Sequence, residues 1–370
     1  MILNILILGS RGIPARYGGF ETYVDKLSTG LVQSGHSVTV FNPHHHKVKG
    51  QIYNGVRIKY VFDPEIYFKN RVIKAACTII FDFLCFLRAF INKQDVILLC
   101  GYASGPLMIL NKFSSKIFIV NPDGFEWKSS RWGKLAKKWL EFSERMSYLI
   151  SDGIIADSLA IKEYFQNKYP IKNIISIPYG AELYESLDPL KEWSKDEYYL
   201  AIARMVPETS IPMIIDGFLN SNSLKKLLIV GPIKDKKFFE EEVLPKIDNI
   251  KVLYLGCIYE YMVVPRLRNN SFCLLHGHAS DGTNPSLIES MGCKSCVLAI
   301  DRKSNRIPLT NHYDVYFKDS EELSKKINWL ETISYEKRLE IKEFNYEQIK
   351  NNFSWDKAIS KHINFFKLLK

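Results

Sequence analysis

Short apolar runs alternate with helical segments along most of the chain, and this alternation restricts the fold more than any other feature. Residues 2–8 form the first run, and residues 37–41 form the second after a loop and a helical stretch at 20–34. A strand buried on both faces is apolar throughout, whereas a helix covering a sheet keeps its apolar residues on one side. The pattern therefore predicts β-loop-α-β units, the opening of a doubly wound α/β domain.

The alternation occurs in two series, which predicts two domains in a chain of 370 residues. In the first series, we expect further strands at 57–62, 95–100, 116–120, 153–156 and 174–177. In the second, we expect strands at 199–203, 226–230, 251–255, 272–276 and 296–299, and helices at 211–220, 237–247, 261–269 and 286–291. The expected organisation is a first domain over residues 1–185, a polar linker over 186–197, a second domain over 198–345, and a C-terminal helix over 346–370 packed back on the first domain.

Residues 72–91 fit this scheme least well, because they are very apolar yet are interrupted by Lys74, Asp82 and Arg88. Three interpretations remain open: a buried helix of the first domain, a helix partly inserted in a membrane interface, and a helix that spans a membrane. The spanning interpretation places Asp82 near the bilayer centre, at a cost of about 2.5–3.5 kcal/mol on insertion scales.

Composition excludes several classes of protein and leaves the partner open. A chain that is 46% hydrophobic and 24% charged is neither disordered, collagen-like nor a multi-span membrane protein. The net charge of +10 indicates either a polyanionic partner or solubility alone. The basic, aromatic segment 134–139 favours an anionic lipid surface over nucleic acid. The N-terminal run lacks the features of an export signal, so we expect a cytoplasmic protein, peripheral on the inner face of the plasma membrane.

The seven cysteines predict neither disulfides nor a metal site. They are odd in number and lie mostly in apolar runs, as reduced core thiols do. Cys293 and Cys296 have metal-ligand spacing, with His276 and His278 upstream, but the chain offers no second cysteine pair to complete a zinc site. We therefore expect no bound metal.

Three loops after expected strands carry residues suited to binding phosphate. The first, residues 9–22, holds Arg11 and Arg16, together with Gly18 and Gly19, which let the backbone approach a ligand closely. It does not have the G-x-G-x-x-G spacing of dinucleotide oxidoreductases. The carboxyl ends of parallel strands and the N-termini of the following helices share one edge of a sheet, where free N–H groups favour anions. We expect the phosphate site at that edge.

The other two loops belong to the second series. Arg204 follows an expected strand, and its guanidinium can pair bidentately with a diphosphate. Thr283, Asn284 and Ser286 lead into a helix, and Glu289 lies one turn further on, where a carboxylate can accept hydrogen bonds from ribose hydroxyls. Asp281 precedes Glu289 by eight residues.

The order of these motifs resembles the retaining GT-B glycosyltransferases of the group 1 (family 4) type. More narrowly, the chain is similar to bacterial rhamnosyltransferases, a group that includes capsular β1-4 rhamnosyltransferases. The segments that carry the resemblance are GSRGIPA at 9–15, YGGFET at 17–22, NPDGFEWK at 121–128, PYG at 178–180, HGH at 276–278 and GTNPSL at 282–287.

The resemblance implies a GT-B fold, with two Rossmann-like domains facing a cleft and a C-terminal helical tail. It implies transfer of a hexosyl group with retention, specifically rhamnose from dTDP-rhamnose, onto a lipid-linked saccharide in capsule, exopolysaccharide or O-antigen synthesis. It implies no cofactor and no metal; the partners are the nucleotide sugar, the lipid-linked acceptor and an anionic membrane surface, without nucleic acid. Two alternatives stay open: a nucleotide-sugar epimerase of the same fold, and a non-catalytic protein that binds a nucleotide sugar.

The resemblance also assigns roles to residues. The catalytic set is Asp281, Glu289 and Asp123. The donor-binding set is Gly18, Gly19, Arg204, Thr283, Asn284, Ser286 and Leu287. The acceptor set is Arg16, Glu21 and Glu126. Two departures affect the donor contacts: Thr209 and Ser210 occupy places where many relatives have Lys-Gly, and the place of Asp281 is usually a glutamate.

Overall fold

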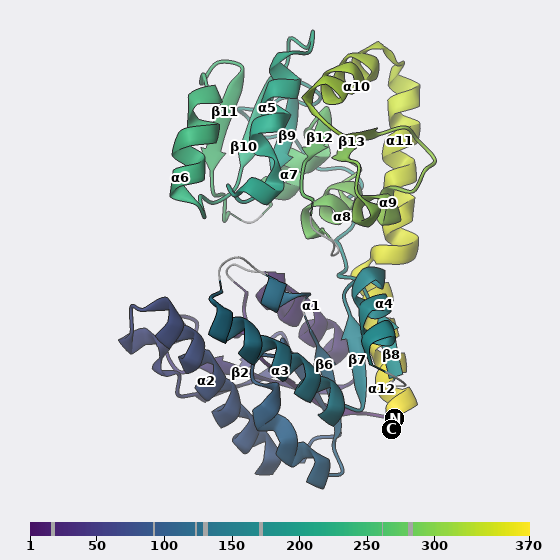
Figure 1. Cartoon of the computed structure of the whole chain (residues 1–370). Coiled ribbons are helices and arrows are strands. Elements are labelled where there is room, and N and C mark those ends of the chain that lie inside the picture. The colour runs from purple at the N-terminus through teal and green to yellow at the C-terminus, as the bar shows by residue number, and fades with distance from the viewer. Residues whose placement is uncertain are drawn as a thin grey trace. The chain divides into compact units, whose positions relative to one another are not determined.

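The computed structural model describes residues 1–15, 19–91, 93–122, 124–128, 132–169, 173–260, 262–279 and 284–370. The chain divides into two compact units. The first contains residues 1–178 and 358–370, and the second contains residues 179–357. Figure 1 shows a sheet flanked by helices within each unit.

The first unit is built on a sheet with the order β3-β4-β2-β1-β5-β6-β7-β8. Every neighbouring pair is parallel except β3 and β4, which pair antiparallel. The strands are β1 (Asn4–Leu8), β2 (Ser37–Pro43), β3 (Ile52–Tyr53), β4 (Val56–Val61), β5 (Val96–Cys100), β6 (Ile117–Asn121), β7 (Gly153–Ala156) and β8 (Asn173–Ser176). Strands β1, β2, β5, β6 and β7 are buried almost throughout, as their continuous apolar runs predict, whereas β4 alternates between buried and exposed residues.

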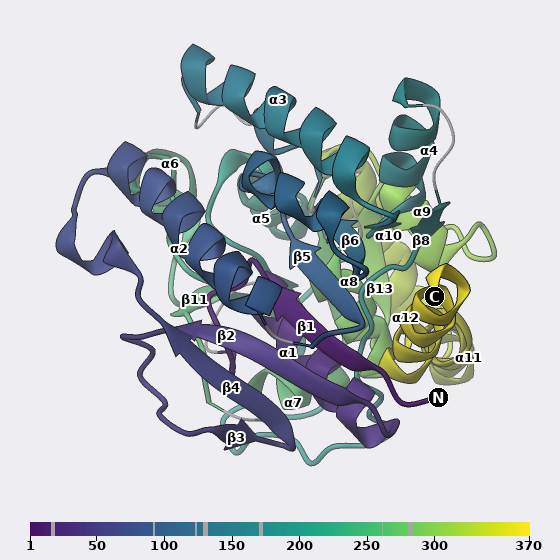
Figure 2. The same cartoon turned by 90° about the horizontal axis from the view of Figure 1, so that it is seen from below.

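Helices cover both faces of this sheet. They are α1 (Gly19–Gln33), α2 (Arg71–Ile91), α3 (Lys134–Ile150), α4 (Leu159–Lys168) and α12 (Trp355–Leu369). Figure 2 shows α2 and α3 on the same side of the sheet. Their buried side chains form one apolar cluster with alternate residues of the strands, among them Leu6, Leu8, Ile97 and Leu99. The opposite face receives α1 and the C-terminal part of α12, which contact each other where Gly30 meets Ile359.

The apolar segment at 72–91 forms α2. One stripe of the helix, including Cys77, Phe81 and Cys85, is buried against the sheet, and Asp82 is buried with it. The hydroxyl of Ser104 donates a hydrogen bond to the Asp82 carboxyl group. The opposite stripe of α2 is exposed. Among the described residues, no helix has the length and apolar character needed to cross a bilayer.

The second unit is built on a fully parallel sheet with the order β11-β10-β9-β12-β13-β14. The strands are β9 (Tyr198–Ile202), β10 (Lys226–Val230), β11 (Val252–Gly256), β12 (Cys273–His276), β13 (Val297–Ile300) and β14 (Tyr316–Phe317). From β9 the chain first moves outward through β10 and β11, then returns to β12 on the other side of β9. The point where the order reverses is therefore the crevice between β9 and β12.

The helices of the second unit are α5 (Ile211–Leu219), α6 (Lys236–Phe238), α7 (Val263–Asn270), α8 (Pro285–Gly292), α9 (Lys303–Leu309), α10 (Ser320–Thr332) and α11 (Tyr335–Gln348). The helix expected at 237–247 is interrupted: α6 continues as a π-helical turn at Phe239–Val243 and a 3₁₀ turn at Leu244–Lys246. Pro245 lies in that last turn, and it lacks the N–H that would continue an α-helix. With both sheets parallel and helices on their faces, the predicted doubly wound α/β class is confirmed.

The expected linker is not a free connection. The units divide after Pro178 rather than after residue 185, and residues 186–197 lie within the second unit. The Leu187 backbone is fixed at both ends, because its N–H donates to Asn269 at 2.9 Å and its carbonyl accepts from Asn270 at 3.0 Å. Further along, the Asp196 N–H donates to the Asn270 carbonyl at 2.8 Å. Composition correctly marks this segment as polar but does not reveal these backbone partners.

The C-terminal residues 358–370 belong to the first unit, whereas residues 346–357 belong to the second. Phe365 and Leu369 occupy the space left by the missing side chain of Gly153 at the start of β7. His362 is fully buried, and its Nε2 lies 2.7 Å from the Tyr23 hydroxyl. Its Nδ1 lies 2.7 Å from the Ala358 carbonyl, which can only accept, so Nδ1 carries the proton and Nε2 accepts from Tyr23.

This buried imidazole predicts a loss of stability in acid. Burial lowers the pKa of His362 to about 4, below the value of about 6.5 for an exposed histidine. Between those values only the unfolded state binds the proton, so the free energy of unfolding should fall as pH decreases, by about 1.4 kcal/mol per pH unit from this group. In urea titrations across this range, His362→Gln should give a shallower pH dependence than the wild type. Parallel pH profiles for the two proteins would contradict the assignment.

Candidate active site at the carboxyl edge of the second sheet

The crevice between β9 and β12 brings two loops together at the carboxyl edge of the second sheet. Residues 203–210 follow β9, and residues 277–279 begin the loop after β12. The Ala279 N–H donates to the Glu208 carbonyl at 3.2 Å. Gly277 approaches the first loop so closely that a Cβ there would lie 2.6 Å from the Thr209 carbonyl oxygen. Any side chain at position 277 would clash with this carbonyl oxygen. The close contact therefore explains why a glycine lies between His276 and His278.

Arg204 supplies the positive charge of this edge. It lies two residues beyond the end of β9 and is exposed. Within the described ranges, no carboxylate forms an ion pair with it, so its guanidinium is available to a ligand. Its backbone is fixed, because its carbonyl accepts from the Thr209 hydroxyl at 2.9 Å and from the Val206 N–H at 3.0 Å. An unpaired guanidinium on a fixed backbone is suited to binding an anion.

Two histidines face the same crevice with unsatisfied ring nitrogens. His276 ends β12 and is buried, and its Nε2 has no hydrogen-bond partner among the residues that the structure describes. Nδ1 of His278 is also buried, and none of the described side chains or backbone groups is hydrogen-bonded to it. Burial lowers the pKa of His276 to about 3, and burial together with the positive charge of Arg204 lowers the pKa of His278. Both rings are therefore neutral near pH 7 and can serve as hydrogen-bond partners without adding charge. Buried polar atoms of this kind normally have partners, so these two nitrogens indicate a ligand or water.

The first turn of α8 also lies at this edge. Asn284 is the N-cap, but its side chain does not cap the helix. Instead its Nδ2 donates to Asn305 Oδ1 at 2.9 Å, and Nδ2 of Asn305 donates to the carbonyls of His278 and Ile300. Asn305 therefore links the loops after β12 and β13. Pro285 has no N–H, and the Leu287 N–H already donates to the Asn284 carbonyl at 3.1 Å, so the start of α8 attracts an anion chiefly through the positive end of its helix dipole.

Ser286 and Leu287 lie in this first turn. The Ser286 hydroxyl donates to the Ile202 carbonyl at 3.2 Å, which fixes the start of α8 against the end of β9, two residues before Arg204. Leu287 is fully buried, so its side chain contributes packing, and its N–H already donates to the Asn284 carbonyl at 3.1 Å. The structure thus brings Arg204, Asn284 and Ser286 to one crevice, and their role in donor binding stays a prediction.

Glu289 follows one turn later and is already engaged. Its Oε2 lies 2.5 Å from Nη2 of Arg268, which comes from α7 and is buried. About a third of the Glu289 side chain is exposed, so its other oxygen can still accept from a ligand. Arg268 was not predicted as the partner of Glu289, because the two residues lie on different helices.

The corresponding edge of the first unit carries a second charged cluster. Arg11 follows β1 and pairs with Asp63 at 3.0 Å and Glu65 at 2.5 Å, both of which follow β4. Gly9 has a positive φ of 82°, and a Cβ there would lie 2.1 Å from the Cys100 carbonyl oxygen, so the loop runs tightly against the end of β5. This cluster was not predicted, since Asp63 and Glu65 lie outside the three loops expected to bind phosphate.

The remaining predicted residues are only partly described. Gly19 begins α1 and Glu21 lies in its first turn, while Glu126 begins a 3₁₀ turn, η3 (Glu126–Lys128), after β6. Both elements follow strands of the first sheet, at its carboxyl edge. The predicted residues Asp281, Asp123, Gly18, Thr283 and Arg16 lie outside the described residues. Their roles stay predictions.

Cys293 and Cys296 are buried in the core of the second unit, as core thiols are expected to be. Within the described part of the chain, no group of three or more His, Cys, Asp or Glu side chains is arranged to hold a metal ion. A cavity of about 520 Å³ in the first unit, lined by Lys112, Lys116 and Asp152 among others, lies at the amino edge of that sheet and so does not belong to the candidate site.

One known protein family matches the N-terminal half of the chain, which contains residues 1–178 of the first unit. The model of a domain of unknown function, DUF1972, matches residues 2–182. A protein from Klebsiella pneumoniae, described as an uncharacterized 42.6 kDa protein in cps region, is 38% identical over 66 residues. That match covers 18% of this chain and 18% of the relative, so the chain matches less than a fifth of that protein's length.

Solved structures match the whole chain. A sucrose-phosphate synthase from Thermosynechococcus elongatus has a TM-score of 0.77 at 15% identity, with 99% of each chain covered. The Anabaena protein HepE, in complex with UDP and glucose, has a TM-score of 0.73 at 15% identity, covering 99% of this chain and 100% of its own. A glycosyltransferase from Rickettsia africae has a TM-score of 0.71 at 16% identity, covering 100% and 98%. At these identities the likeness establishes the fold, and the expected GT-B fold is confirmed.

Proposed function

We propose that the protein is a glycosyltransferase that uses a nucleoside-diphosphate sugar as donor. The observation that carries the proposal is Arg204, which is exposed and has no ion-pair partner in the described part of the chain, at the point where the strand order of the second sheet reverses and beside the start of α8. Ligands of open parallel sheets bind at such points. The complex of HepE, which has the same fold, with UDP and glucose supports this ligand class.

In this proposal different residues of the crevice bind different parts of the donor. Arg204 and the positive N-terminal end of α8 hold the diphosphate and stabilise the negative charge that develops on it as the sugar leaves. Glu289 accepts from the ribose hydroxyls through the oxygen that Arg268 does not occupy. The free nitrogens of His276 and His278 are available for hydroxyls of the sugar or for water.

The finer features are proposed on the sequence resemblance. The anomeric C–O bond to the diphosphate breaks, a C–O bond to an acceptor hydroxyl forms with retention, and the hydroxyl proton passes to the departing phosphate. The proposed donor is dTDP-rhamnose, without a metal or cofactor, and Asp281 and Asp123 lie near the sugar. The acceptor is a lipid-linked saccharide held by the first unit through Arg16, Glu21 and Glu126. Similarity to a protein in a cps region supports a surface polysaccharide as the product.

A donor screen followed by a transfer assay tests this function. The full chain is heated with UDP-, dTDP- and GDP-sugars, and a bound donor raises the melting temperature because it binds only the folded state. The stabilising donor is then incubated with and without a lipid-linked saccharide and followed by NMR. Transfer only when the acceptor is present supports the proposal. Conversion of the donor alone identifies an epimerase, binding without turnover identifies a binding protein, and no stabilisation by any nucleotide sugar contradicts the site.

Replacing Glu289 tests the ribose contact. Glu289→Gln keeps the size of the side chain but removes its charge, and hydrogen bonds to charged groups contribute about 1.5–3 kcal/mol. We therefore expect nucleotide affinity, measured by calorimetry, to fall about tenfold or more. Glu343→Gln is the matched control, because Glu343 also pairs with a basic residue, Lys294 at 2.8 Å, but lies on α11 away from the crevice. Equal affinity in Glu289→Gln and wild type would show that the ribose lies elsewhere.

A further inference from the structure

The outer surface of α2, η2 and α3 in the first unit is unusually apolar. The exposed stripe of α2 contains Val72, Ile73, Ile80, Leu87, Phe90 and Ile91. The opposite stripe of α2 is buried against the sheet, so the helix is apolar on both sides. A helix whose outer side faces water normally has polar residues on that side. Ile91 is 86% exposed, so this surface is not covered by the rest of the described chain.

Two neighbouring elements extend the same surface. The 3₁₀ segment η2 (Gly105–Phe113) packs against both α2 and α3, and it exposes Ile109, Leu110 and Phe113. The helix α3 exposes Leu135, Trp139, Phe142 and Leu149. These four positions are spaced by four, three and seven residues, so they follow one side of the helix. Since α2 and α3 lie on the same side of the sheet (Figure 2), the exposed residues form one outward-facing layer, here called the apolar face.

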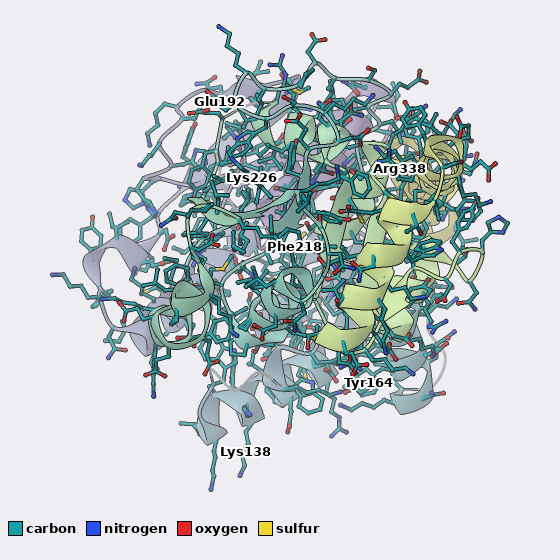
Figure 3. The ribbon with its side chains drawn as sticks, turned by 90° about the horizontal axis from the view of Figure 1, so that it is seen from above. Lys138, Tyr164, Glu192, Phe218, Lys226 and Arg338 are labelled. Carbon is teal, nitrogen blue, oxygen red and sulfur yellow. The ribbon has the colours of Figure 1, made fainter. Side chains whose placement is uncertain are left out.

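The charges that border the apolar face are nearly all positive. Lys112 lies on η2, and Lys134, Lys137, Lys138 and Arg145 lie on α3. Over the described residues, none of these five cations forms an ion pair with a carboxylate. Glu141 is the exposed acidic residue of α3, whereas Glu144 is buried and paired with Lys168 at 2.8 Å. Figure 3 shows Lys138 directed away from the body of its unit.

We propose that the apolar face docks on an anionic lipid bilayer. Apolar side chains interleaved with unpaired lysines and arginine match the boundary between acyl chains and negatively charged headgroups. The long basic side chains can keep their charges among the headgroups while their neighbours enter the apolar layer. A second copy of this chain is a poorer partner, because a symmetric dimer through this face would bring the two clusters of unpaired cations together.

This inference concerns a surface distinct from the candidate site and goes beyond the proposed function. It gives an enzyme that acts on a lipid-linked acceptor a way to reach it, but it does not depend on the transfer reaction. Vesicle binding and donor binding are therefore measured separately, so that either can fail alone.

The experiment measures binding of the full chain to sedimented vesicles. One set contains phosphatidylglycerol and phosphatidylcholine in equal amounts, and the other contains phosphatidylcholine alone. The test variant replaces three strongly exposed residues, one from each element: Ile91→Ser, Phe113→Ser and Leu135→Ser. Leu224→Ser, Leu244→Ser and Ile250→Ser form the matched control, since these residues are exposed apolar side chains of the second unit. A charge variant, Lys134→Gln with Lys138→Gln, is compared with Lys236→Gln and Lys237→Gln on α6.

We expect the wild type and both controls to bind anionic vesicles, and to bind neutral vesicles at least about tenfold more weakly. The apolar triple variant and the charge variant should each lose about tenfold or more in affinity for anionic vesicles, while donor-induced thermal stabilisation stays unchanged. Absence of vesicle binding by the wild type, or equal loss in the matched controls, would overturn the proposal. So would a concentration-dependent dimer that the triple variant abolishes.

Discussion

Replacing Arg204 with alanine is expected to lower kcat for sugar transfer by about 10²–10³-fold, with a smaller effect on folding. The guanidinium is exposed and unpaired, so its removal leaves no buried partner unsatisfied. In the proposed reaction it stabilises the charge that develops on the leaving diphosphate, and removing one such donor costs catalysis of this size. Steady-state transfer kinetics with the donor identified by the thermal screen provide the measurement.

Two further variants make this result specific. Arg204→Lys keeps the charge but loses the planar fork that pairs bidentately with phosphate, so its activity should lie between those of wild type and Arg204→Ala. Arg57→Ala removes an exposed arginine from β4, in the other unit, and should leave transfer unchanged. Full activity of Arg204→Ala would show that the diphosphate does not bind in this crevice. The main support for the proposed function would then be lost.

Replacing Phe366 with alanine is expected to destabilise the first unit by about 3–5 kcal/mol. Phe366 is fully buried on α12, where it lies 6.0 Å from the His362 ring, and loss of a buried phenylalanine ring leaves a cavity of corresponding cost. Urea unfolding followed by intrinsic fluorescence measures the change. Leu368→Ala, at an exposed position two residues further along the same helix, should change stability by no more than about 0.5 kcal/mol. Similar losses in both variants would mean that α12 is not an integral part of the core.

The strand pattern could be predicted closely because buried parallel strands are continuous apolar runs. The strand expected at 153–156 has those bounds in the structure, and the one expected at 226–230 does too. The two-residue strands β3 and β14 were missed, since so short a segment has no periodicity to detect. The helix expected at 237–247 is broken near Pro245, so an amphipathic pattern there did not specify one regular helix.

Only those features of the candidate site that depend on neighbouring residues in the sequence could be predicted. Arg204, Asn284 and Ser286 could be proposed as donor contacts because each follows a strand and opens a loop or a helix, and their roles stay predictions. Arg268, which pairs with Glu289, and Asn305, which joins two loops, were missed because their partners lie about 20 residues away in the sequence and come from other elements. The unsatisfied nitrogens of His276 and His278 depend on burial, which only the folded chain reveals.

The path of the chain has a consequence for how its parts can be studied. Residues 358–370 complete the first unit, yet the matched family region ends at residue 182. A fragment limited to that region would lack Phe365, which packs over Gly153, and Ile359, which packs against Gly30. The apolar surface around both glycines would then be exposed to water. Expression of this half in isolation therefore calls for a fusion that grafts the terminal helix onto residue 178 through a short spacer.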